Sequence, residues 1–137
     1  MADTFQIEIV TPDKMVVRDV VEEAQVPAKN GYLGILPGHA PLITELAIGE
    51  ITYRSSGTTT HISVAWGFAE VLPDKLTILA ESAERAEDID VKRAEEAKQR
   101  AEERLRSGQS DLDYNRALNA LKRAEVRLQV AHSIAHQ

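Results

Sequence analysis

The sequence predicts an all-β N-terminal sandwich or flattened barrel followed by a C-terminal antiparallel αα-hairpin. Up to about Ser82, apolar and polar residues alternate in short segments separated by turn residues, the pattern of half-buried strands. From about Asp88, small apolar residues recur at helical spacing. Charge divides at the same place: residues 1–83 carry 5 Lys or Arg against 11 Asp or Glu, and residues 84–137 carry 11 of each. We therefore expect two domains, 1–83 and 84–137.

The strand prediction rests on four segments in which the alternation is clearest: 5–9, 50–54, 61–64 and 75–79. Turn residues such as Pro12-Asp13 and Pro73-Asp74 separate them. Short strands with this punctuation are typical of a sandwich or small barrel. We expect one inner layer, filled by Ile7, Ile9, Val26, Leu36, Ile51, Ile62, Val64, Phe68, Val71, Leu76 and Ile78.

The helical part is predicted as two helices joined by a short link. Asp88 or Asp90 is the expected N-cap of the first helix, which stops at Ser107-Gly108, and the second begins near Ser110 or Asp111. One stripe of each helix is made of small apolar residues: Ala94, Ala97, Ala101 and Leu105 in the first, and Ala117, Leu121, Ala124, Leu128 and Ala131 in the second.

An alanine-rich seam removes little apolar area from water, and burial is worth about 25 cal/mol per Å². The hairpin is therefore predicted to be only marginally stable against opening. Two interpretations follow from the pattern: a solvated helical pair with no further role, or a segment that folds back on the sandwich in one state and extends along another protein in a second.

Composition excludes several classes of function. The 137 residues contain no cysteine, which excludes disulfides and thiolate chemistry, and the net charge of −6 makes a nucleic-acid partner unexpected. The N-terminus has neither the basic nor the apolar region of a signal peptide, and every apolar run is far shorter than the roughly 20 residues needed to span a bilayer. Any membrane association is expected to pass through partners.

The most informative segment is 31–41, Gly-Tyr-Leu-Gly-Ile-Leu-Pro-Gly-His-Ala-Pro, which reads as a tight connection between strands. Together with the strand order and the hairpin, it resembles the epsilon subunit of F-type ATP synthases, from Phe5 to about Ala131. The resemblance implies a rotor subunit whose sandwich contacts the gamma subunit and the c-ring. It also implies helices that alternate between a compact hairpin and an extended form, which inserts among the catalytic alpha and beta subunits and opposes ATP hydrolysis.

The run 89–94, Ile-Asp-Val-Lys-Arg-Ala, is similar to the ATP-binding signature of some bacterial epsilon subunits. Arg93 and Arg100 share one helix face and Arg123 and Arg127 another, so folding of the hairpin brings four guanidinium groups toward one phosphate site. The resemblance assigns Ile89 and Asp90, with Glu84, to the adenine end, and Ala94 completes the signature. Regulatory ATP is thus a possible ligand. Equally, the arginines can be solvated surface and Asp90 only a helix cap.

The other notable residues are expected to have no catalytic role. The segment with Gly31, Tyr32, Leu33 and His39 is the expected partner interface nearer the c-ring. His39 lacks a neighbouring nucleophile or carboxylate cluster, and His132 with His136 lacks the rest of a zinc motif, so we expect neither a catalytic nor a metal site. Trp66, the single tryptophan, stands where the family usually has a small residue.

The sequence therefore predicts a non-catalytic central-stalk subunit that couples proton translocation through the c-ring to ATP synthesis. Its C-terminal helices are expected to inhibit ATP hydrolysis, and ATP sensing is a possible further role of the same helices. Its expected place is the cytoplasmic face of a bacterial inner membrane, bound peripherally. The alternative is a stand-alone ligand-binding β-sandwich with a helical tail that binds protein, which needs a concave site in residues 1–83.

Overall fold

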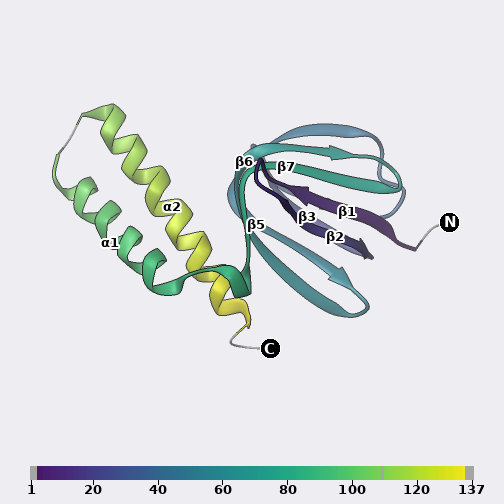
Figure 1. The fold of residues 1–137 in the computed structure, drawn as a ribbon. Helices are drawn as coiled ribbons and strands as arrows, with labels where there is room; N and C mark the ends of the chain where they lie inside the picture. Colours follow the sequence, from purple (N-terminus) through teal and green to yellow (C-terminus); the bar gives the residue numbers. More distant parts are fainter. Residues whose placement is uncertain (1–2, 109, 135–137) are drawn as a thin grey trace.

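The computed structural model describes residues 3–108 and 110–134, and it has a β-sandwich with a helical hairpin at one end (Figure 1). Seven strands come first and two helices follow. The strands are β1 (Phe5–Val10), β2 (Met15–Val21), β3 (Glu23–Ala28), β4 (Gly31–Ile35), β5 (Leu42–Ser55), β6 (Thr58–Val71) and β7 (Lys75–Arg85). Among the described residues, neither helix has the length and apolar character needed to span a membrane.

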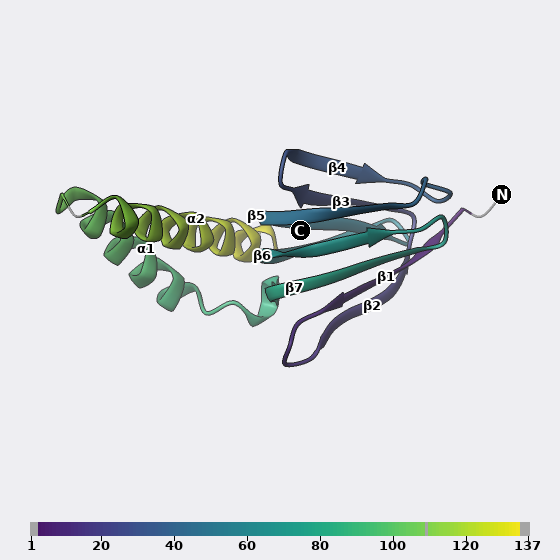
Figure 2. The same ribbon diagram turned by 90° about the horizontal axis from the view of Figure 1, so that it is seen from above.

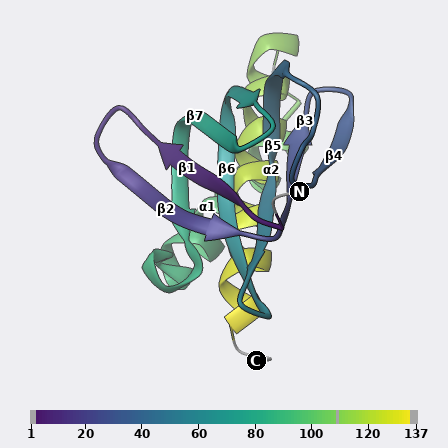
Figure 3. The same ribbon diagram turned by 90° about the vertical axis from the view of Figure 1, so that its right-hand side faces the viewer.

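The strands form one strongly bent sheet in the order β2-β1-β7-β6-β5-β3-β4. Neighbouring strands are antiparallel except β1 and β7, which run parallel. The long strands β5, β6 and β7 belong to both layers of the sandwich. The β1–β2 hairpin crosses one side of them, and α2 lies on the other side (Figure 3).

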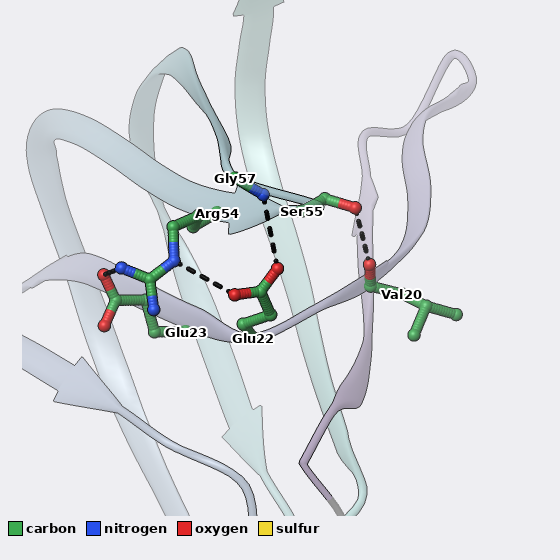
Figure 4. Close-up of polar contacts among 6 residues, drawn as sticks. All are labelled: Val20, Glu22, Glu23, Arg54, Ser55 and Gly57. Atoms are coloured by element: carbon green, nitrogen blue, oxygen red, sulfur yellow. Dashed lines mark hydrogen bonds and ion pairs between the residues drawn. The ribbon is translucent and has the colours of Figure 1, made fainter.

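Polar contacts close the sandwich where the end of β2 meets the end of β5 (Figure 4). The Ser55 hydroxyl donates to the Val20 carbonyl at 2.8 Å, and Arg54 Nε donates to Glu22 Oε2 at 3.2 Å. Arg54 Nη1 also lies 3.1 Å from Glu23 Oε1. The Ser55 contact joins β5 to β2, which is not its neighbour in the sheet, whereas Arg54 pairs with residues at the start of the neighbouring strand β3. Each contact joins segments more than thirty residues apart in the chain.

The predicted core is confirmed at nine of its eleven positions and wrong at two. Leu36 is 60% exposed, because it follows β4, where alternation directs Ile35 inward instead. Phe68 is 54% exposed. The run 31–41 also differs from the prediction, since its first five residues form an edge strand, β4, paired with β3.

Phe68 is exposed because the alternation of inward and outward side chains shifts by one residue partway along β6. The core takes Ile62 and Val64 from the first half of β6, but Ala69 and Val71 from its second half. The residues between them include Trp66 and Gly67, which both have positive φ, 53° and 129°. The regular alternation of inward and outward side chains is interrupted at such a backbone. Counting every second residue from Ile62 therefore places Phe68 in the core wrongly.

The two helices begin and end close to the predicted positions. A short 3₁₀ turn, η1 (Ala86–Asp88), leads from β7 into α1 (Val91–Arg106), and α2 (Asp111–Ser133) follows. Asp90 caps α1 by accepting a hydrogen bond from Arg93 N at 3.0 Å, and Ser110 caps α2. Viewed from above, α2 runs back to the sandwich while α1 lies away from it (Figure 2).

Replacing Gly67 with alanine should destabilise the sandwich strongly. A Cβ at this position would lie 2.0 Å from the Leu79 carbonyl oxygen, and the φ of 129° suits only glycine. We expect Gly67→Ala to lower the free energy of unfolding by about 2–4 kcal/mol in urea titration. The matched control is Gly34→Ala, whose Cβ would meet no atom within 4 Å. Equal free energies of unfolding for the two variants would contradict the conclusion that the backbone at Gly67 requires a glycine.

Candidate functional site

The hairpin is attached to the sheet through the second half of α2. Arg127 Nε lies 2.7 Å from Glu84 Oε1, and Arg127 Nη2 donates to Glu84 Oε2 at 3.2 Å. Two residues further on, Gln129 Nε2 donates to Glu50 Oε2 at 3.1 Å. The other oxygen of Glu50 contacts His61 Nδ1. These contacts fix α2 to β5, β6 and β7 together.

An apolar cluster completes this attachment. Ala86, Ile89, Val130 and Ala131 are buried against one another, with the half-buried Val126 beside them. Val130 is fully buried, and Ile89 is only 8% exposed. Because the cluster joins the turn that follows β7 to the end of α2, it ties the two ends of the hairpin to each other next to the sandwich.

Helix α1 packs on α2 through the predicted alanine seam. Ala94, Ala101, Ala117 and Ala124 are each at most 2% exposed, whereas Leu105, Leu121 and Leu128 are only half-buried. Buried methyl groups of alanine contribute little apolar area. Apart from its first residues, α1 therefore depends on a weak contact with α2.

A cavity of about 500 Å³ lies where both helices meet the end of β7. Its volume falls within the range of small-molecule sites. Among the residues that the structure describes, five arginines reach it, three from α1 and two from α2, and Glu84 is the one carboxylate that lines it. The arginines are Arg93, Arg100, Arg104, Arg123 and Arg127. Such an excess of guanidinium groups suits an anion with several oxygens.

The structure brings together the four arginines predicted from the sequence, and Glu84 with them. It adds Arg104, which the sequence reasoning missed although it stands one helical turn after Arg100. Ile89, Asp90 and Ala94 do not line the cavity. Ile89 belongs to the apolar cluster, Asp90 caps α1 and Ala94 is in the seam, so all three shape the start of α1.

The residues predicted for the partner interface separate into two places. Tyr32, on β4 with Gly31 and Leu33, accepts a hydrogen bond through its hydroxyl from Glu50 N at 3.2 Å, beside the contact that holds α2. His39 lies in the turn after β4, where Gly38 N donates to the Pro73 carbonyl at 2.8 Å. This turn is at the end of the sandwich away from the helices (Figure 2).

An exposed row of apolar side chains crosses β5, β6 and β7 and consists of Ile43, Phe68 and Leu79. Phe68 pairs with Leu79 across β6 and β7, and Ile43 is two residues from the partner of Phe68 on β5. Their exposed fractions are 54%, 56% and 70%. The sequence reasoning placed Phe68 in the core, so it missed this surface.

Within residues 3–108 and 110–134, no three His, Cys, Asp or Glu side chains are arranged to hold a metal ion. His132 is exposed near the end of α2, and His136 lies outside the described residues.

Two family profiles match the chain. Residues 4–86 match the ATP synthase Delta/Epsilon chain beta-sandwich domain, and residues 87–132 match its long alpha-helix domain. An ATP synthase epsilon chain of Koribacter versatilis is 72% identical over 107 residues, which are 78% of this chain and 75% of the relative. That of Solibacter usitatus is 53% identical over 102 residues, 74% of this chain and 76% of the relative.

The fold is also similar to chains in solved assemblies. A chain from the Euglena gracilis mitochondrial ATP synthase structure, which contains OSCP, F1 and the c-ring, has a TM-score of 0.80 at 19% identity, covering 100% of this chain and 84% of that one. A chain from the Tetrahymena thermophila central stalk and c-ring structure has a TM-score of 0.61 at 10% identity, covering 93% and 96%. At these identities the likeness shows a shared fold.

A β-sandwich followed by a helical hairpin, with both parts matched in order, defines the class of small stalk subunits of rotary ATP synthases. The chain belongs to the ATP synthase delta/epsilon chain family. It is a non-catalytic rotor subunit of F-type ATP synthase, in the peripheral F1 part of the complex.

Attachment of the hairpin should fail when a charge is placed in the apolar cluster. Val130→Asp buries a carboxylate without a partner, which disfavours docking of α2. We expect faster amide exchange throughout α1 and α2, with the exchange of the sandwich unchanged. Leu118→Asp, on an exposed side of the same helix, is the control. If exchange in Val130→Asp matches that in the control, the cluster is not the anchor.

Proposed function

We propose that the chain couples the gamma subunit to the c-ring at the cytoplasmic face of a bacterial membrane, and that its hairpin inhibits ATP hydrolysis under the control of ATP. The sandwich provides the contacts to the rotor. The hairpin, when extended, reaches the alpha and beta subunits. The observation that carries the regulatory part is the convergence of five arginines on one cavity around a single glutamate.

ATP fits this cavity through its triphosphate. Guanidinium groups bind phosphate oxygens by paired, charge-assisted hydrogen bonds, and three of the lining arginines come from α1 while two come from α2. The adenine would lie toward the start of α1, where Ile89 and Asp90 precede Arg93. Glu84 already pairs with Arg127, which keeps that guanidinium at the cavity wall before ATP arrives.

Binding of ATP would favour the compact hairpin because the cavity exists only when the two helices are folded together. A ligand shifts a conformational equilibrium by its differential affinity for the two states. At about 100 times its Kd, ATP would stabilise the compact state by about 2.7 kcal/mol. That is a substantial effect on helices joined by an alanine seam.

The rotor contacts are proposed on two surfaces. The exposed apolar row of Ile43, Phe68 and Leu79 suits a stable protein contact, because large exposed apolar side chains grouped on one face mark interaction sites. We assign it to the gamma subunit. The turn with His39, at the end away from the helices, is assigned to the c-ring. Gly31, Tyr32 and Leu33 remain candidates for the edge of this interface.

Titration of the isolated protein with ATP by calorimetry tests the regulatory proposal. We expect binding, and an affinity loss of about tenfold or more in Arg100→Ala, the size of one lost charge-assisted hydrogen bond. Arg106→Ala, on the same helix but not lining the cavity, should bind as the wild type does. Inorganic tripolyphosphate measures the contribution of the phosphates alone. No heat with ATP from folded protein would reject the proposal.

Copurification with the gamma subunit tests the rotor contact. Phe68→Asp should weaken the association at least tenfold, because it places a charge in the apolar contact. Val20→Asp is the control, since Val20 is similarly exposed, at 57%, on an edge strand away from the row. Unchanged association of Phe68→Asp would remove the row from the gamma interface.

A further inference from the structure

Trp66 has an unusual backbone for its size. It stands inside β6 with a φ of 53°, in the left-handed region that glycine adopts readily and a bulky residue adopts at a cost. The register does not change around it: Leu46 pairs with Gly67, and Ile48 pairs with Ala65. No residue is inserted to relieve the strain. A strained residue that the surrounding structure holds in place points to a role for its side chain.

The Trp66 side chain contacts one of the arginines that line the cavity. Arg123 Cζ lies 5.2 Å from the centre of the Trp66 ring, within the range of a cation–π contact. Arg123 lines the cavity, as does Ser82, which follows Glu81 on the strand facing Trp66. The ring thus belongs to the sheet, whereas the guanidinium that it contacts belongs to α2.

The partner of Arg123 differs in kind from that of Arg127. Arg127 is paired with the carboxylate of Glu84, which neutralises part of its charge and competes with an incoming anion. Arg123 has an aromatic face beside it, which orients a guanidinium without neutralising it. An aromatic face takes up none of the guanidinium N–H donors in an ion pair, so those donors can bind an anion. Of the two α2 arginines, Arg123 is therefore the better placed to give its full charge to a phosphate.

We propose that Trp66 is a positioning residue of the phosphate site, holding Arg123 at the cavity wall when α2 is docked on the sheet. The inference rests on the proposed function, because it concerns the same cavity. It adds a direct link between the sheet and the ligand: docking of α2 presents Arg123, and a bound triphosphate then draws α1 onto it. Loss of the ring should weaken ligand binding without weakening the sandwich.

The test compares Trp66→Gly with Trp66→Phe in the full chain. Glycine removes the ring and relieves the left-handed backbone, so the thermal midpoint of the sandwich should stay the same or rise. The Kd for ATP and for inorganic tripolyphosphate should rise about fivefold, the size expected of a partly exposed cation–π contact. Phenylalanine keeps an aromatic face and should recover part of the affinity.

A second readout uses the fluorescence of Trp66, the only tryptophan in the chain. Saturating ATP should change its emission in the wild type and leave it unchanged in Arg123→Ala. Wild-type affinity in Trp66→Gly would overturn the role of Trp66 while leaving the proposed function standing. Absence of ATP binding by the wild type would overturn both. A lower thermal midpoint in Trp66→Gly, with no recovery of affinity in Trp66→Phe, would reduce Trp66 to a structural residue and also overturn the inference.

Discussion

The compact arrangement of the helices depends on the contact between residues 123–131 of α2 and the outer face of β5, β6 and β7. Four side chains of this segment make the contact. Arg123 lies over the Trp66 ring, and Arg127 and Gln129 bind the carboxylates of Glu84 and Glu50. Val130 packs in the apolar cluster with the turn that follows β7. No comparable set holds α1 to the sheet in the described residues. Helix α2 is therefore held firmly on the sheet, whereas α1 is held only weakly, through α2.

In the proposed function, electrostatics would make the position of α1 sensitive to anions. Five guanidinium groups around one carboxylate repel one another, and the alanine seam offers little apolar burial to oppose that repulsion. An anion in the cavity would replace this repulsion by charge-assisted hydrogen bonds to both helices. The state of α1 would then report the concentration of the ligand, while α2 keeps its place on the sheet. The exposed apolar row lies on the same outer surface, next to the region covered by α2.

Local patterns predicted most of the fold. The helix starts and the alanine seam follow from residues within a few positions of one another. Asp90 caps α1, as one of the two residues expected there, and α2 begins at Asp111 after Ser110. The exposed positions of Leu36 and Phe68 could not be predicted in the same way. They depend on where β4 ends and on a phase change at Trp66 and Gly67, which only the packing of two layers determines.

The candidate site divides similarly. Helical spacing placed four arginines together and, extended by one turn, would have found Arg104. It gave no sign that Gln129 meets Glu50, a contact across 79 residues, or that Arg123 lies over the ring of Trp66 on β6. Contacts between a helix and a distant strand leave no periodic trace in the sequence. The burial of Ile89 in the apolar cluster likewise became visible only once the end of α2 was placed beside it.

Amide exchange of the full chain with and without saturating ATP, resolved along both helices, is the most direct measurement of this account. We expect ATP to add strong protection across residues 91–106 of α1 and across the first half of α2. Residues 123–131 should change little, because the sheet already holds that part of the helix. Protection gained equally along all of α2, or gained by neither helix when ATP is bound, would contradict it.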